Sequence, residues 1–135
     1  MAVRGRHGAR RMLLQALYQW QLAGHELAEL RHQFAGQPAY EGIDTEYFDT
    51  QLACILEGAE AFDATIAEAA DRPVAQLDPV EHAVLWIGLA ELTGRADVPP
   101  KVAINEAVEL AKEFGASDSH RYINAILDAV AGSRD

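Results

Sequence analysis

Cysteine is nearly absent from this chain of 135 residues, in which Cys54 is the only one. A single cysteine cannot form an intramolecular disulfide, and it excludes every zinc site built from several thiolates. Long apolar runs are also missing, because Gln15, Gln19 and Gln21 interrupt the apolar stretch near the start. No run approaches the roughly 18 apolar residues of a membrane-spanning helix, and no small-residue cleavage site follows the basic start. We therefore expect a cytoplasmic protein with no membrane contact.

Acidic residues are absent from the first eleven positions, which hold one histidine and four arginines: Arg4, Arg6, Arg10 and Arg11. The whole chain is nevertheless acidic, with 21 Asp and Glu against 11 Lys and Arg and a formal net charge of -10. An acidic body repels nucleic acid and anionic lipid at long range. Any contact with a polyanion must therefore be local, and we expect a basic N-terminal arm over residues 1–9.

Every periodic segment of the chain has helical spacing, and none alternates as a strand does. The expected fold is all-α, a compact bundle of about six to seven helices, with a single helical domain over residues 10–132. Its first helix starts at about Arg10, and a long helix that ends at Pro73 is expected to bend or split at Gly58.

The stretch "LDPVEHAVLWIGLAEL" carries the strongest helix signal in the chain. Asp78 suits the N-cap, Pro79 the first helical position, and Glu81 the reciprocal position of a capping box. The residues after it are apolar nearly all round, which predicts the most buried helix of the fold. A later helix is expected to end at Gly115, with Phe114 on its inward stripe.

No arrangement of residues points to catalysis or to a bound cofactor. There is no phosphate-binding glycine loop, and His25 and His32, seven residues apart, are expected at the surface. The run Asp118-Ser119-His120 fails as a triad, because consecutive helical side chains point about 100° apart. We expect helix capping there, no metal site, no cofactor and no enzyme.

Two groups of residues favour RNA binding. Arg11, Gln15 and Tyr18 fall at i, i+4 and i+7, which aligns a cation, an amide and an aromatic ring on one helix face. Single-stranded RNA uses these groups for phosphate neutralisation, base-edge hydrogen bonds and stacking. Arg121 and Tyr122 lie near a helix N-terminus, where backbone amides can receive a phosphate. The alternatives are a disordered solubilising terminus and, for Tyr122, a place at the rim of the core.

Three blocks, "RRMLLQALYQWQL", "DPVEHAVLWIGLAEL" and "DVPPKVAINEAVELAKEFGASDSHRYINAILD", resemble the NusB family of bacterial transcription antitermination factors. The resemblance spans nearly the whole chain. It implies an all-helical fold of two small three-helix lobes and a role without catalysis. It also implies binding to the boxA element of nascent ribosomal RNA together with NusE, a small-subunit ribosomal protein, and through them association with RNA polymerase and other Nus factors.

The resemblance also implies roles for particular residues. It assigns RNA contacts to the N-terminal arginines, and Tyr18, Asp118 and Tyr122 match positions on or near the RNA surface. Glu81 matches a position on the NusE-facing side, so Glu81 and Asp118 are predicted partner contacts, and a capping role for Glu81 is compatible with this. His82 and Trp86 stand where family members commonly carry basic residues, which leaves core and interface open for both.

In the combined hypothesis, the basic and acidic parts of the chain bind different partners. The arm and the first helix hold RNA, while the acidic body recruits the basic NusE. The main alternative is a helical scaffold protein whose basic arm mediates self-association, for example as a homodimer. An RNA methyltransferase is a weaker alternative, because the chain has no strand and glycine loop for a methyl donor.

Overall fold

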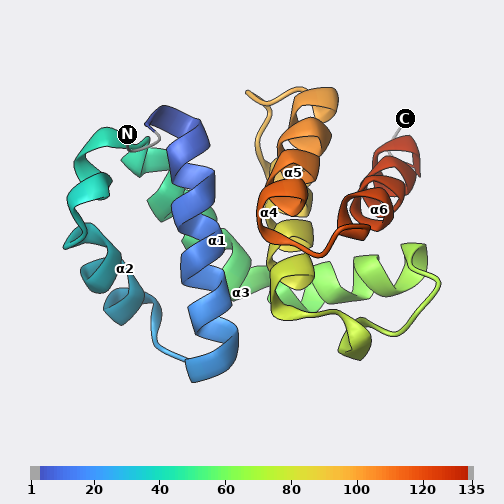
Figure 1. Ribbon diagram of the computed structural model, residues 1–135, viewed down its shortest axis with the longest axis horizontal. Coiled ribbons are helices and arrows are strands. Elements are labelled where there is room, and N and C mark those ends of the chain that lie inside the picture. The colour runs from blue at the N-terminus through green and yellow to red at the C-terminus, as the bar shows by residue number, and fades with distance from the viewer. Residues whose placement is uncertain (1–3, 134–135) are drawn as a thin grey trace. The chain divides into compact units, whose positions relative to one another are not determined.

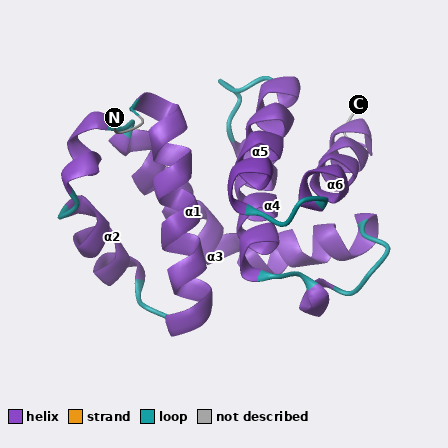
Figure 2. Ribbon diagram, viewed as in Figure 1, coloured by secondary structure: helices purple, strands orange, loops and turns teal. Residues whose placement is uncertain are grey.

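The computed structural model describes residues 4–133 and is built from helices joined by short loops (Figures 1 and 2). The predicted all-α class is confirmed, because the one β feature in residues 4–133 is an isolated parallel bridge between Gly5 and Ile43. Within this part of the chain no helix is both long enough and apolar enough to cross a membrane. The elements are α1 (Gly5–Ala23), α2 (Leu27–Ala35), η1 (Pro38–Gly42), α3 (Thr45–Ala69), η2 (Val74–Gln76), α4 (Pro79–Gly94), α5 (Pro100–Phe114) and α6 (Ser119–Ser133).

The chain divides into two compact units, Met1–Glu57 and Gly58–Asp135, and the helical domain predicted over residues 10–132 includes parts of both. Unit 1 contains α1, α2 and the first part of α3, and unit 2 contains the rest of α3 with α4, α5 and α6. The predicted split at Gly58 is wrong, because α3 runs through this residue as one helix, while the predicted bend stays a prediction. A helical glycine costs about 0.5–1 kcal/mol relative to alanine, which is too little to break a helix of 25 residues.

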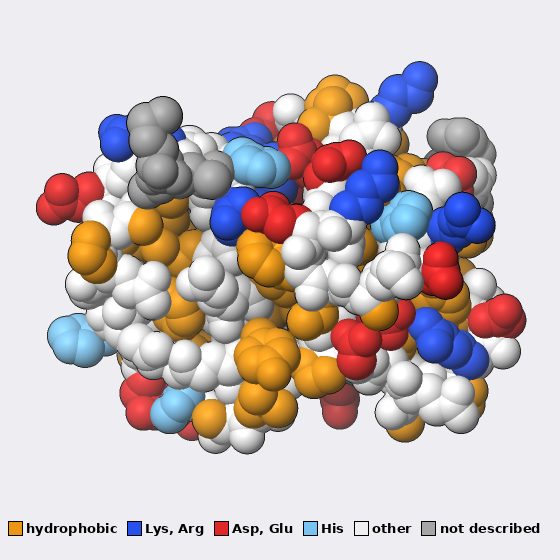
Figure 3. Space-filling view, viewed as in Figure 1, with side chains coloured by type: hydrophobic (Ala, Val, Ile, Leu, Met, Phe, Trp, Pro, Cys, Tyr) orange, Lys and Arg blue, Asp and Glu red, His pale blue; other side chains and the backbone are white. Residues whose placement is uncertain are grey.

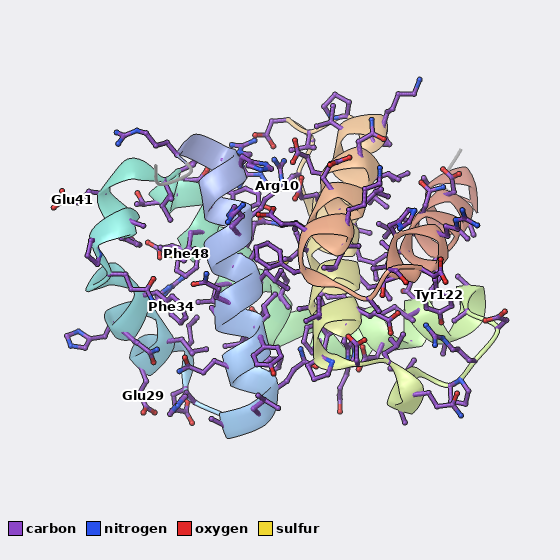
Figure 4. The ribbon with its side chains drawn as sticks, in the orientation of Figure 1. Arg10, Glu29, Phe34, Glu41, Phe48 and Tyr122 are labelled. Atoms are coloured by element: carbon purple, nitrogen blue, oxygen red, sulfur yellow. The ribbon has the colours of Figure 1, made fainter. Side chains whose placement is uncertain are left out.

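The core of unit 1 forms between α1, α2 and the start of α3. Phe34 of α2 and Phe48 of α3 lie side by side with ring centroids 6.1 Å apart (Figure 4). The ring of Tyr40, from η1, meets Phe48 edge-on at the same centroid distance. Around these rings the core is filled by aliphatic side chains that are fully buried, among them Leu13, Leu17, Leu30, Leu52 and Ile55.

The first helix begins five residues earlier than the sequence predicts, at Gly5 instead of Arg10. Gly5 has φ +66°, a backbone conformation that favours glycine. Gly8 and Ala9 are buried, so these small residues let the first turns of α1 pack closely. The predicted arm over residues 1–9 is therefore largely helix, and its residues 1–3 lie outside the described part of the chain.

Unit 2 is organised around α4, which packs against both α5 and α6. As the apolar sequence predicts, α4 is buried on nearly every side, with Ala83, Val84 and Leu85 fully inaccessible. The capping box of Asp78 and Glu81 at its start is also confirmed. Phe114, in contrast, is 38% exposed although its spacing predicts an inward position. It is the last residue of α5, where the packed stripe of that helix ends.

Gly88 of α4 lies against Leu127 of α6 and leaves no room for a side chain. A Cβ at this position would stand 2.7 Å from Leu127 Cδ1 and 3.4 Å from Ala107 Cβ. Leu127 is fully buried and has no open space to turn into. We expect Gly88→Ala to lower the free energy of unfolding by about 1–2 kcal/mol, because overpacking outweighs the gain in helix propensity. Urea denaturation followed by circular dichroism measures this change.

The matched control is Gly132→Ala in α6, where a Cβ would meet nothing within 4 Å. This exposed change should stabilise the chain by about 0.4–1 kcal/mol, since alanine has the higher helix propensity and restricts the unfolded chain. Equal stabilisation by both substitutions would show that the crossing at Gly88 has room for a methyl group.

Candidate nucleic-acid interface

The N-terminal arginines lie against the segment that enters α3. Both Nε and Nη2 of Arg6 donate to Oδ2 of Asp44, at 3.2 and 3.1 Å. The backbone N–H of Asp44 donates to the carbonyl of Gly5 at 2.9 Å, beside the parallel bridge. Arg4 packs over Gly42, where an added Cβ would stand 3.1 Å from its Nη1. The start of α1 is thus tied to the loop before α3.

Tyr47 completes this arrangement from the first turn of α3. The guanidinium carbons of Arg6 and Arg10 lie 5.2 and 5.4 Å from the centroid of its ring, within cation–π range. Tyr47 itself is fully buried, and Asp44 Oδ1 accepts its backbone N–H at 3.1 Å as the cap of α3. We call Gly42, Asp44 and Tyr47 the arginine cradle.

The four predicted arginines differ in how much surface they offer. Arg4 is exposed, and Arg6 and Arg11 are partly exposed. Arg10 is only 5% exposed, and its guanidinium carbon lies over the Tyr47 ring (Arg10 is labelled in Figure 4). On the face shown in Figure 3, basic side chains lie beside acidic ones, so they form no unbroken positive patch there.

The predicted line of Arg11, Gln15 and Tyr18 does lie on an outer face of α1. Gln15 is exposed and Tyr18 is 43% exposed, so an amide and an aromatic face are open to solvent one turn apart. Leu22 continues the same line at i+4 from Tyr18 and is 63% exposed. Leu22 was not among the residues predicted for this surface, although its spacing from Tyr18 places it on this face.

The second predicted group lies at the start of α6. Asp118 and Arg121 are exposed, while Tyr122 is partly buried (labelled in Figure 4). The guanidinium carbon of Arg72 stands 3.9 Å above the Tyr122 ring, so one face of this aromatic is already covered. Contact with Tyr122 and the charge of Glu81 both raise the pKa of Arg72, against the opposing effect of burial. Arg72 was not among the residues predicted from the sequence.

Glu81 joins three segments of unit 2. Its Oε1 accepts the backbone N–H of Asp78, and its Oε2 accepts from Arg72 Nη2 at 3.2 Å and from the Ser119 hydroxyl at 3.1 Å. Ser119 is 4% exposed and Glu81 is 7% exposed. The predicted capping role is confirmed. Little of the Glu81 carboxylate is accessible to a partner protein, and the predicted partner contact stays a prediction.

A family model for the NusB family matches residues 7–132 of this chain. The chain belongs to the NusB family. Among curated NusB proteins, the transcription antitermination protein NusB of Shewanella woodyi is 44% identical over 129 residues, which cover 96% of each chain. The relative from Shewanella sediminis matches equally well, at 44% identity over the same length.

Solved NusB structures share the fold. The NusB of T. maritima superposes with a TM-score of 0.85 at 25% identity, covering 98% of this chain and 93% of that one. A chain from a crystal structure of antitermination factors NusB and NusE with double-stranded RNA gives a TM-score of 0.79 at 24% identity. That match covers 94% of this chain and 96% of the other.

In this NusB-family chain Trp86 belongs to the core. It is 4% exposed, and its indole Nε1–H donates to Asp63 Oδ1 at 2.9 Å. His82 shares the same carboxylate oxygen at 2.6 Å, and its ring lies 4.1 Å from the Trp86 ring. His82 is partly exposed at the edge of this cluster. The question that the sequence left open is therefore settled for Trp86, which fills space between α3 and α4.

Besides that of Arg72, the pKa values of Cys54 and Tyr40 are raised. Burial, and next the charge of Glu57, raise the pKa of the Cys54 thiol, which disfavours the nucleophilic thiolate form. Burial and the neighbouring Asp49 also raise the pKa of Tyr40, whose hydroxyl donates to that carboxylate at 3.2 Å. Within residues 4–133 no three metal-ligating side chains of the His, Cys, Asp or Glu type gather at one point.

Proposed function

We propose that this chain is a transcription antitermination protein that binds boxA-like single-stranded RNA together with NusE, and so helps to assemble an antitermination complex on RNA polymerase. Its membership of the NusB family carries this proposal. The role is one of binding and assembly in the cytoplasm, and no catalysis is proposed. The curated relatives are named transcription antitermination proteins over nearly their full length.

The RNA-binding surface in this proposal combines Arg4, Arg6 and Arg11 with the open face of Gln15 and Tyr18. The arginines neutralise phosphates, and the aromatic ring offers a stacking plane for an unpaired base. Three partly or fully exposed arginines are few for a tight complex, so the isolated chain should bind weakly. A second set of contacts from NusE would then raise the affinity.

The charge of the remaining chain suits a basic partner. Residues 12–135 carry all 21 acidic side chains against seven basic ones, which favours encounter with a cationic protein. NusE is predicted to be that partner. Arg121, Tyr122 and Asp118 at the start of α6 remain predicted contact residues at the RNA or partner surface.

The salt dependence of RNA binding tests this surface. For the isolated chain and a boxA-like strand, the logarithm of affinity should fall by about 2 per decade of salt. This slope follows from about 0.7 for each phosphate neutralised on a single strand, applied to the three accessible arginines. A fluorescence anisotropy titration at four salt concentrations measures it, with a scrambled strand as comparison and with NusE added in a second series.

Two substitutions make the test specific. Arg11→Gln should reduce the slope by about 0.7, whereas Lys101→Gln, which removes an exposed charge on α5 of unit 2, should leave it unchanged. Equal affinity for the boxA-like and scrambled strands, with and without NusE, would contradict the proposed function. A slope much steeper than 3 would show that further cations bind RNA.

The scaffold alternative is less well supported by the geometry. An arm that swaps between protomers needs to leave its own chain, yet residues 4–10 are tied to the arginine cradle through Asp44 and Tyr47. Sedimentation of the full chain and of a chain without residues 1–9 separates the two functions. Loss of a dimer on truncation, with RNA affinity unchanged, would favour the scaffold.

A further inference from the structure

We propose that the arginine cradle positions Arg4 and Arg6 for RNA before RNA arrives, with Asp44 as the main positioning residue. This inference rests on the proposed function, because it concerns the same RNA surface. It adds three residues, Gly42, Asp44 and Tyr47, none of which the sequence analysis assigned to the site. None of the three is itself required to touch RNA.

Asp44 is built to orient an arginine. Its two carboxylate oxygens do different tasks, because Oδ1 caps α3 at the Tyr47 N–H and Oδ2 receives two donors from Arg6. The backbone of the same residue binds the Gly5 carbonyl, so the carboxylate is fixed with respect to the first turn of α1. A guanidinium carries five N–H donors in a rigid fork. A carboxylate that engages two of them therefore fixes the plane of the guanidinium group.

The other two cradle residues, Tyr47 and Gly42, restrict arginine side chains by packing against them. The buried ring of Tyr47 lies beneath the guanidinium groups of Arg6 and Arg10. Gly42 leaves the space through which the Arg4 side chain passes, since a Cβ there would stand 3.1 Å from Nη1 and 3.2 Å from Cζ. Long side chains lose rotamer freedom when they bind, and holding them in advance lowers that cost.

Charge and positioning predict opposite effects for Asp44, which makes the proposal testable. If only net charge mattered, removing this carboxylate would strengthen RNA binding and steepen its salt dependence. If Asp44 positions Arg6, removing it weakens binding although the chain becomes more positive. The Asp44 side chain is 27% exposed, so salt screens part of its repulsion of RNA.

The test variant is Asp44→Ser. Serine is an equally good N-cap and keeps the start of α3, but its hydroxyl is too short to hold the Arg6 guanidinium. We expect affinity for a boxA-like strand to fall about 2- to 5-fold at 0.15 M salt, the scale of one side chain released from its fixed rotamer. The thermal midpoint should change little. The Arg6 Nε–H signal in ¹⁵N NMR spectra should shift and exchange faster with solvent.

A second pair of variants changes no charge. Gly42→Ala places a methyl group against Arg4, and we expect it to lower RNA affinity about 2- to 5-fold. Gly36→Ala is the matched control, because a Cβ there meets only backbone oxygens at 3.4 Å and beyond. It should leave the affinity unchanged. This pair keeps the proposal testable if Asp44→Ser fails to fold.

The outcomes separate the cradle from the proposed function. If the unsubstituted chain does not distinguish a boxA-like strand from its scramble, the proposed function fails. If it does, but Asp44→Ser binds RNA as well as or better than the unsubstituted chain, Asp44 is not a positioning residue. Equal affinities of Gly42→Ala and Gly36→Ala would likewise overturn the role of Gly42.

Discussion

Trp86→Ala is expected to lower the free energy of unfolding by about 3–5 kcal/mol, the largest stability loss that we predict for a single substitution. The indole is 4% exposed, and its removal leaves a cavity between α3 and α4. It also removes one of the two donors to Asp63 Oδ1 and the ring against which His82 packs. Urea denaturation followed by circular dichroism at 222 nm measures the loss.

Trp86→Phe is the matched control for this cavity. It keeps most of the apolar volume and removes the indole N–H, so it should cost only about 1–2 kcal/mol. In both variants Trp20 is the remaining tryptophan, and its fluorescence reports on unit 1 during the same titration. A loss below 1 kcal/mol for Trp86→Ala would mean that position 86 is not part of the core.

Glu81→Ala is expected to lower the free energy of unfolding by about 2–4 kcal/mol. The substitution removes the hydrogen bond from the Asp78 N–H to Glu81 Oε1, which contributes about 0.5–1.5 kcal/mol. The buried Ser119 hydroxyl left without its acceptor contributes about 1–3 kcal/mol. The ion pair with Arg72 adds little, because the Arg72 side chain is 37% exposed and solvent screens it. The same denaturation experiment measures the total.

Two further variants distinguish the structural role of Glu81 from its predicted role in partner binding. Glu109→Ala removes an exposed acid of α5 and should change stability by no more than about 0.5 kcal/mol. Glu81→Gln keeps a carbonyl oxygen for capping and removes the charge. If Glu81→Gln folds normally and binds NusE as the unsubstituted chain does, the predicted partner contact of Glu81 is wrong. If NusE binding falls while stability holds, the carboxylate has both roles.

Features that repeat along one helix could be predicted well from the sequence. The capping box at α4 spans four consecutive residues, and local geometry alone decides whether Asp78 and Glu81 meet. The line from Arg11 to Tyr18 is likewise set by helical periodicity, because these residues share one face of any helix that contains them. The predicted start of α1 was wrong, because the positive φ of Gly5 and its backbone hydrogen bond to Asp44 give no periodic signal in the sequence.

The amino-acid sequence by itself determined the all-α class, the main helices, the family, and the uneven distribution of charge, since each depends on neighbours within a few turns or on composition. Tertiary structure alone decided which distant polar groups meet. Arg6 and Asp44 are 38 residues apart, as are Ser119 and Glu81. Contacts at such separations depend on how whole helices pack, because every acidic side chain attracts every basic one and only packing selects the pair.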